Sequence, residues 1–135
     1  DDLIAVNRRN YEAYCRHLAG LPGISVIRYD PAERNNYQYI VLEVNPEIAP
    51  LNRDELVAKL HAENVLARKY FWPGCHRMEP YRSLQPNAAL LLPETERVAA
   101  RILLLPTGQA VTVEMVGKIC DIIGQLFRLA RAVHA

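Results

Sequence analysis

The amino-acid sequence predicts an α+β fold, in which a small, mostly antiparallel sheet of about three to four strands is covered by helices on one face. Three observations predict it. Amphipathic helical patterns stand at both ends of the 135 residues, alternating strand patterns follow the first helix, and the connections between elements are short. A chain of this length forms one domain around a single core, so helices and strands share that core.

Residues 1–18 predict the first helix, because apolar residues recur at helical spacing with arginines on the other side. The helix is expected to end near residues 21–23, where glycine permits a left-handed stop and proline blocks continuation. The chain has no initiator methionine and starts inside this pattern. We therefore expect it to be a piece of a longer protein.

Two strand patterns come next. Residues 24–29 alternate as a half-buried strand. Residues 37–44 give the clearest strand in the sequence, with Ile40, Leu42 and Val44 on one face. We expect this apolar face to lie on the core.

A second helix is predicted to begin at Asn52, because Asn52 and Glu55 have the spacing of a capping box. It should stop near Asn64, and residues 65–70 predict another strand. Residues 70–82 then form a loop rich in aromatic, proline, glycine, histidine and arginine residues. Loops at the end of a strand often carry function.

The last part of the chain predicts two helices and a short buried segment. Residues 83–92 are expected to be irregular, and residues 94–101 form a short helix. Its apolar side chains are expected to face inward: Val98, Ala99 and Ile102. Residues 103–105 are a brief strand, and Thr112 caps a last helix with a broad apolar face that extends to Val133.

Composition excludes several classes of protein. The net charge of +1 comes from interspersed charges, so no basic face for nucleic acid is expected. The apolar runs are too short to span a membrane, and no signal peptide is recognised. Three widely spaced cysteines do not form a disulfide framework, which favours a reducing compartment. We therefore expect a cytoplasmic protein.

Local chemistry predicts no catalytic residue and no metal site. Cys75 and His76 are neighbours, but no second pair of ligands completes a tetrahedral set. They also make a poor nucleophile and base, because adjacent side chains on extended backbone point to opposite faces. The three lysines are expected to be solvated rather than to bind a cofactor covalently: Lys59, Lys69 and Lys118.

Two interpretations of residues 70–82 remain open at this point. In one, His76 and the two arginines, Arg77 and Arg82, present cations and donors to an anionic ligand. In the other, the aromatic residues plug a small core and the arginines face water. The aromatic residues concerned are Phe71, Trp72 and Tyr81.

Taken in order, these segments resemble the C-terminal small domain of the DegT/DnrJ/EryC1/StrS family of pyridoxal-phosphate-dependent sugar aminotransferases, which have fold type I. The segments that carry the resemblance are residues 7–11 with 18–24, 35–41, 53–56 with 60 and 64–65, 70–82, and 93–99 with 103–106. Two departures stand out. Asn64 replaces the family's usual glycine, and Cys75 replaces the residue that often precedes the histidine.

The resemblance implies transfer of an amino group from an amino acid to a nucleotide-linked keto sugar by a homodimeric parent enzyme. In the family, the lysine, the aspartate and the phosphate-binding residues that hold pyridoxal phosphate lie in the large domain. We therefore expect residues 1–135 to be a single small domain that lacks the cofactor-binding domain and is inactive alone. A relative that has become a sugar dehydratase remains an alternative.

The resemblance also suggests which residues line or support the sugar-nucleotide pocket. We expect His76 and Tyr70 first, then Asn36, Tyr37 and Arg77, because they stand at the ends of two predicted strands. The competing hypothesis is a stand-alone, non-catalytic ligand-binding or assembly module whose last helix binds a partner. A domain of a larger enzyme should instead expose an apolar patch, which we expect on the first helix.

Overall fold

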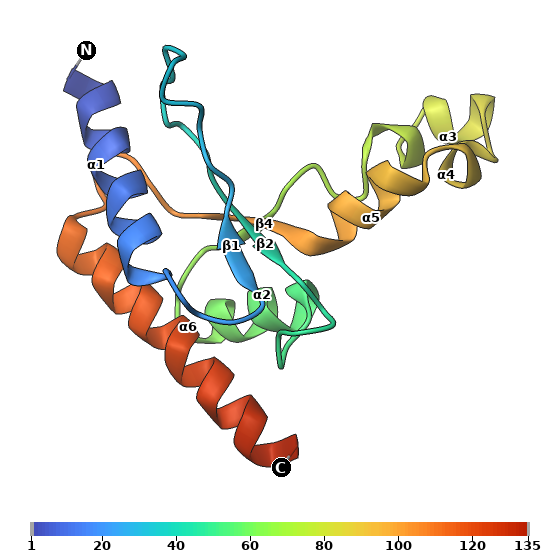
Figure 1. Ribbon diagram of the computed structural model, residues 1–135. Coiled ribbons are helices and arrows are strands. Elements are labelled where there is room, and N and C mark those ends of the chain that lie inside the picture. The colour runs from blue at the N-terminus through green and yellow to red at the C-terminus, as the bar shows by residue number, and fades with distance from the viewer. Residues whose placement is uncertain (1, 135) are drawn as a thin grey trace.

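An open antiparallel sheet of four strands lies at the centre of the fold, in the order β1-β2-β4-β3 (Figure 1). The computed structural model describes residues 2–134. The strands are β1 (Ile24–Val26), β2 (Ile40–Val44), β3 (Arg68–Lys69) and β4 (Ile102–Leu105). Each neighbouring pair is antiparallel, which confirms the predicted fold class.

Within residues 2–134, six α-helices and one 3-10 turn surround this sheet or extend from it. They are α1 (Asp2–His17), α2 (Arg53–Ala62), η1 (Cys75–Arg77), α3 (Tyr81–Leu84), α4 (Ala88–Leu91), α5 (Pro93–Arg101) and α6 (Val113–His134). The prediction that residues 83–92 are irregular was wrong, because α3 ends there and α4 forms there. Helices of one turn have no repeating apolar pattern by which a sequence could reveal them.

Three predicted strands are shorter than their sequence patterns. β2 begins only at Ile40, because Tyr37 has a left-handed backbone with φ of 52° and interrupts the extended run. β3 begins only at Arg68, because the Ala67 N–H donates to the Val65 carbonyl at 2.8 Å in a tight turn. β1 ends at Val26. Local backbone geometry therefore decides the strand limits.

The register of β2 and β4 sorts the sheet into a buried face and an open face. Ile40 pairs with Leu105 and Leu42 pairs with Leu103, and all four side chains are buried. Buried residues of α1, α2 and α6 complete this core, so the helices cover one face as predicted. The alternate residues of β2 and β4 are only half-buried on the other face: Val41, Glu43, Ile102 and Leu104.

The apolar face of α6 is used inside the molecule. Its central residues are buried in the core: Val116, Ile119, Ile123 and Phe127. Thr112 caps the helix as predicted, since its hydroxyl accepts from the Met115 N–H at 3.2 Å. Val133 was also predicted to lie on this face, but its side chain is exposed because α6 continues past the sheet.

The predicted capping box of α2 is confirmed. Asn52 accepts from the Glu55 N–H at 2.9 Å, and the Glu55 carboxylate accepts from the Asn52 N–H at 2.9 Å. At the other end, Asn64 adopts a left-handed backbone with φ of 59°. Asparagine tolerates this conformation better than most residues, so it can stop a helix where glycine is the commoner choice.

A long excursion, which we call the arm (residues 70–101), leaves the body of the domain between β3 and β4. Figure 1 shows α3, α4 and α5 projecting away from the sheet. Within the described chain, neither α3 nor α5 has a buried residue. The prediction that Val98 and Ala99 face the core was therefore wrong. Val98 and Ala99 instead lie within the arm, because α5 extends beyond the edge of the core.

Asn10 joins α1 to the connection between β4 and α6. Its side chain is fully buried, and its amide donates to the Val111 carbonyl at 3.0 Å and the Gly108 carbonyl at 3.3 Å. The nearby Tyr14 hydroxyl donates to the Pro106 carbonyl at 2.9 Å. Two buried polar groups thus fix how α1 packs against the segment that leads into α6.

We predict that Asn10→Ala lowers the free energy of unfolding by about 2 kcal/mol, because it leaves buried carbonyls without a donor. Chemical denaturation followed by circular dichroism measures this loss. Asn7→Ala is the matched control on the same helix. Its amide makes one exposed bond of 3.3 Å to the Asn36 carbonyl, so the change should stay below about 0.5 kcal/mol. Equal losses would contradict the assigned role of Asn10.

Candidate functional site

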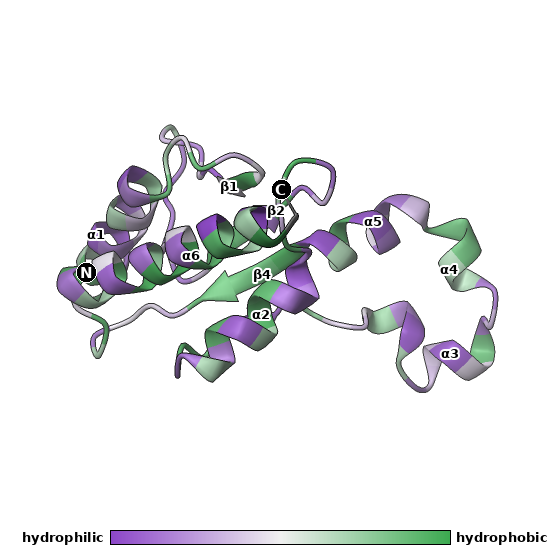
Figure 2. Ribbon diagram, turned by 90° about the horizontal axis from the view of Figure 1, so that it is seen from below, coloured by the Kyte–Doolittle hydropathy of each residue, from purple (hydrophilic) through white to green (hydrophobic). Residues whose placement is uncertain are grey.

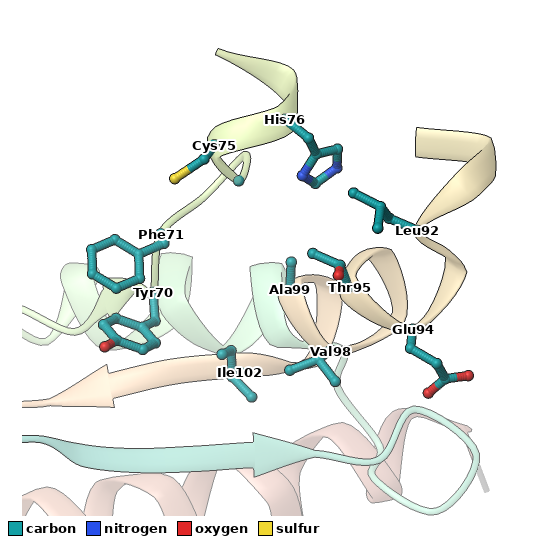
Figure 3. A pocket seen from close by; sticks show the side chains of 11 residues that line it. Tyr70, Phe71, Cys75, His76, Leu92, Glu94, Thr95, Val98, Ala99 and Ile102 are labelled. Carbon is teal, nitrogen blue, oxygen red and sulfur yellow. The ribbon is translucent and has the colours of Figure 1, made fainter. Parts of the chain in front are cut away.

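A cavity of about 630 Å³ lies between the loop that follows β3 and helix α5 (Figure 3). Most of its wall is apolar, and the polar side chains among its lining residues are few. The lining residues are Tyr70, Phe71, Gly74, Cys75, His76, Leu92, Glu94, Thr95, Val98, Ala99 and Ile102. Its volume lies in the range of small-molecule sites, which span roughly 300–1,000 Å³.

Arg53 holds the arm onto the body of the domain. Its side chain is only 2% exposed, although it carries a charge. One terminal nitrogen, Nη1, donates to the Ala99 and Ile102 carbonyls, both at 2.8 Å, where α5 passes into β4. Nε donates to Asp54 at 2.7 Å. These charge-assisted bonds satisfy the Ala99 carbonyl in the last turn of α5, where intrahelical donors run out, and the carbonyl of Ile102, the first residue of β4.

Trp72 of the loop that follows β3 also packs against Arg53. The Arg53 guanidinium lies 4.7 Å from the centre of the Trp72 ring, and the Lys69 ammonium lies 5.7 Å from it. The second terminal nitrogen of Arg53, Nη2, is buried without a hydrogen-bond partner among the described residues, so the aromatic ring offsets part of its charge. The buried Arg53 cation of α2 therefore also holds Trp72, and with it the loop, against the body of the domain.

Asp54 completes this centre from α2. Its carboxylate pairs with Lys69 at 2.7 Å as well as with Arg53. The pKa of the Asp54 carboxyl is lowered, first by its hydrogen bond with Lys69 and also by Arg53. α2 and the end of β3 therefore meet at one cluster of paired charges.

His76 enters the cavity because Gly74 gives it room. Gly74 has φ of 97°, and a Cβ there would lie 2.7 Å from the His76 ring. The His76 Nε2 contacts the Glu96 carboxylate, which fixes the orientation of the imidazole. The Cys75 thiol and the His76 ring point in different directions (Figure 3), although the backbone here is the 3-10 turn η1 and not the extended segment expected from the sequence. The two side chains therefore do not form a nucleophile and its base.

Arg77 binds the same Glu96 carboxylate, so its charge is used within the protein and is not left free for a ligand. Its guanidinium donates twice to Glu96, with both distances at 2.7 Å. Arg77 first, and His76 second, hold the pKa of Glu96 down to about 2. Arg82 is paired in the same way with Glu79 at 2.7 Å. The two arginines expected to offer charge to an anion are thus neutralised within the arm.

Tyr70 and Phe71 form an aromatic step at one side of the cavity. Their ring centres are 4.2 Å apart, and Tyr70 also contacts Tyr39 at 5.4 Å. Phe71 has a left-handed backbone with φ of 43°, and its side chain is 67% exposed. Trp72 and Tyr81 are exposed as well. The interpretation of these three aromatic residues as a plug for the core was therefore wrong.

The expected site residues divide into two groups. Tyr70 and His76 line the cavity, and Arg77 supports His76 through Glu96. Asn36 and Tyr37 lie elsewhere, because β4 separates β2 from β3 in the sheet. We expected the five residues together because they stand at the ends of two predicted strands, but Asn36 and Tyr37 do not line this cavity, and the sequence does not reveal the strand order.

Asn36 and Tyr37 instead stabilise the segment that leads into β2. The Asn36 side chain accepts from the Gln38 N–H at 3.1 Å. The Tyr37 ring packs on Tyr11 at 5.3 Å and on Tyr29 at 4.9 Å. The Tyr29 hydroxyl donates to the carbonyl of Tyr39, the residue that contacts Tyr70. A row of aromatic residues therefore connects this segment with the cavity.

Sequence reasoning missed Arg53 and Glu96 as organisers of the site. Arg53 stands in a helix start where an exposed arginine is ordinary, and Glu96 stands among other charged residues of α5. Only the burial of Arg53, next to its acceptor carbonyls, distinguishes it. For Gly74, a glycine two residues before a histidine was the one available signal.

The described residues do not fit pyridoxal phosphate at this cavity. Lys69 is engaged with Asp54, Lys118 pairs with Glu114 at 2.7 Å on the surface, and Lys59 is exposed on α2. None of these lysines lines the cavity within the part of the chain that the structure describes. The same residues contain no group of three or more side chains that could hold a metal ion.

Exposed apolar side chains gather on the arm, not on α1 as expected. Over residues 2–134, nine of the seventeen exposed large hydrophobic side chains belong to the arm. Leu90 and Leu91 on α4 are among the most exposed, and Figure 2 shows the hydrophobic colour there. No helix in the described residues is long and apolar enough to cross a membrane.

Comparisons with known proteins agree on one family. A model of the DegT/DnrJ/EryC1/StrS aminotransferase family matches residues 1–124. The chain is 31% identical over 110 residues to dTDP-4-amino-4,6-dideoxy-D-glucose transaminase of Escherichia coli, in a match that covers 82% of this chain and 29% of that protein. The chain therefore spans under a third of that relative's length.

Solved structures give the same result. The crystal structure of DesI in the presence of its TDP-sugar product is similar to this chain, with a TM-score of 0.84 and 40% identity. The match covers 99% of this chain and 34% of DesI. DesV of S. venezuelae shares the fold, with a TM-score of 0.80 at 22% identity, over 93% of this chain and 32% of that one.

We predict that Arg53→Met lowers the free energy of unfolding by about 2–3 kcal/mol, because the Ala99 and Ile102 carbonyls lose their buried donor. Thermal and chemical denaturation measure the loss. Arg97→Met is the control, because Arg97 forms an exposed ion pair with Glu94 and should change stability little. A stable Arg53→Met protein would show that the arm does not depend on this anchor.

We also predict that the Glu96 carboxyl titrates near pH 2 in a carbon-detected NMR titration. Because the pKa is lowered on folding, the cluster stabilises the fold fully above about pH 4.5. The contribution is lost as the pH falls toward 2. In Arg77→Ala the midpoint should move up toward the ordinary value of 4.5. An unchanged midpoint would remove Arg77 as the main cause.

Proposed function

Because the chain belongs to the DegT/DnrJ/EryC1/StrS aminotransferase family, we propose that it is the C-terminal small domain of a longer enzyme. That enzyme transfers an amino group from an amino acid to a nucleotide-linked keto sugar. Residues 1–135 form a single domain that closes over the substrate pocket and shapes it. The domain is inactive alone, because the described residues offer no lysine at the cavity.

The observation that carries this proposal is the cavity lined by Tyr70 and His76 within a chain that matches the family over residues 1–124. The relative from Escherichia coli is a transaminase named for a dTDP-linked amino sugar. DesI crystallised in the presence of a TDP-sugar, which is its product. We propose a dTDP-linked keto sugar as the substrate class and an amino acid as the donor.

Pyridoxal phosphate belongs to the rest of the parent enzyme. When bound there, it supplies the electron sink that amino transfer requires. Residues of this chain act on the sugar nucleotide instead. We propose a cytoplasmic homodimer as the parent, and the three free cysteines of this chain support a reducing compartment.

His76 is the residue best placed to contact the substrate. Glu96 holds its Nε2, so the ring has a fixed orientation before a ligand arrives. No described residue forms a hydrogen bond with the other ring nitrogen, Nδ1, which leaves it for a substrate hydroxyl or carbonyl. Arg77 supports this arrangement through Glu96, and Tyr70 forms the adjoining wall.

Asn36 and Tyr37 have a supporting role in this proposal. Tyr37 packs against Tyr29, and the Tyr29 hydroxyl donates to the Tyr39 carbonyl at 2.8 Å. The Tyr39 ring in turn contacts Tyr70 in the cavity wall. Asn36 stabilises the turn that presents Tyr37. Both residues therefore position the cavity wall without touching the substrate.

We predict that His76→Ala in the intact enzyme raises KM for the nucleotide sugar about three- to tenfold, because one hydrogen bond to the substrate is lost. Steady-state kinetics with both substrates measures it, and KM for the amino donor should not change. His17→Ala is the control, since His17 is exposed at the end of α1. An unchanged KM for the nucleotide sugar would remove His76 from the pocket.

A further inference from the structure

We propose that the cavity of the arm binds the uncharged base of the nucleotide sugar, stacked on Phe71, and that the diphosphate lies outside it. This inference rests on the proposed function, because the family comparison alone does not say which part of the substrate reaches this domain. Three independent observations carry it: the chemistry of the cavity wall, the backbone of Phe71, and the pairing of Arg77, Arg82 and Arg97 within the arm.

The cavity wall suits an uncharged ring. Its floor is formed by apolar side chains of α5 and the start of β4, namely Val98, Ala99 and Ile102. Among the described residues, neither an arginine nor a lysine lines it. A diphosphate requires cations or free backbone N–H groups, and this wall offers His76 as its single basic side chain. Transfer of an apolar ring from water into this cavity lowers the free energy, whereas transfer of a diphosphate raises it.

The N-terminus of α5 does not supply an anion site either. Pro93 occupies the first turn and has no N–H to donate. Glu94 and Glu96 place negative charge in the same turn, where a helix otherwise favours an anion. A diphosphate approaching α5 would therefore meet two carboxylates, and of these only Glu96 is neutralised by two partners.

Phe71 has the properties of a stacking platform. A bulky residue in the left-handed region costs about 1–3 kcal/mol, and such strain gathers at functional sites. Phe71 accepts this conformation and yet leaves its ring 67% exposed, so the fold gains little burial from it. The ring is supported by Tyr70 at 4.2 Å and stands at the side of the cavity. Exposed aromatic rings held in this way stack on nucleobases.

Three of the four arginines of the arm are paired with carboxylates, and the fourth, Arg101, lines a different hollow together with Glu43 and Asn45. Arg77 pairs with Glu96, Arg82 with Glu79, and Arg97 with Glu94, all within 2.8 Å. None of these three is left to hold a phosphate next to the cavity. Of the lining residues, the Thr95 hydroxyl and His76 Nδ1 remain to bond the polar edge of a base. The sugar and the diphosphate then extend away from the arm, toward the rest of the enzyme.

The binding test uses the 135-residue chain and two probes, thymidine and inorganic pyrophosphate, followed by two-dimensional NMR. Thymidine should shift the resonances of Tyr70, Phe71, His76 and Ala99, and pyrophosphate should leave them in place. Two outcomes would overturn the proposal: pyrophosphate shifting the cavity resonances, or thymidine shifting none of them up to its limit of solubility.

A set of variants then tests the platform. Phe71→Ala should weaken thymidine binding about tenfold, because a stacked base contributes roughly 1–3 kcal/mol. Phe71→Tyr keeps the aromatic ring and should bind as the unaltered chain does. Leu84→Ala is the matched control, since Leu84 is similarly exposed on the arm but does not line the cavity. Equal affinity of Phe71→Ala and the unaltered chain would overturn the inference.

The two proposals fail separately. Nucleoside binding is measured without turnover, so it judges the cavity whatever reaction the intact enzyme performs. An intact enzyme without amino transfer to nucleotide sugars would overturn the proposed function alone. An active intact enzyme whose small domain ignores thymidine would overturn this inference alone.

Discussion

The buried guanidinium of Arg53 is the interaction on which the arrangement of this domain depends. It stands at the start of α2 and satisfies two carbonyls where α5 enters β4. It also lies against Trp72 of the loop that follows β3. Both ends of the arm are thus tied to one helix of the body. A buried charge is costly unless it is paired and hydrogen-bonded, so this junction has little freedom to rearrange.

The arm beyond this anchor depends on its own polar contacts rather than on the core. Glu96 binds His76 and Arg77, which joins the 3-10 turn to α5 across the cavity. The same contacts pair Arg77, which adjoins the lining residue His76, with a carboxylate. In the binding mode that we propose, the carboxylate that holds the arm together also makes the cavity unsuited to an anion. The exposed apolar residues of the arm remain available to a larger assembly.

The family and the loop that carries the site could be predicted from the order of short sequence signals, because each signal has a local physical basis. The Asn52 and Glu55 pair and the strand pattern of β2 are examples. The separation of Asn36 and Tyr37 from His76 could not be predicted, because it depends on the strand order. β4 is inserted between two strands that precede it in the chain, and no local pattern encodes that insertion.

By itself, the sequence determined the helices with full apolar faces, the buried face of β2 and the antiparallel class of the sheet. The reason is that the spacing of apolar residues indicates which side of a helix or strand is buried. Tertiary structure alone decided which charges are free. Arg77 and Arg53 have the same chemistry in sequence, yet one is neutralised in the arm and the other is buried at its base. The reason is physical: a charge acts according to its partners and its exposure to water, and both depend on residues distant in the chain.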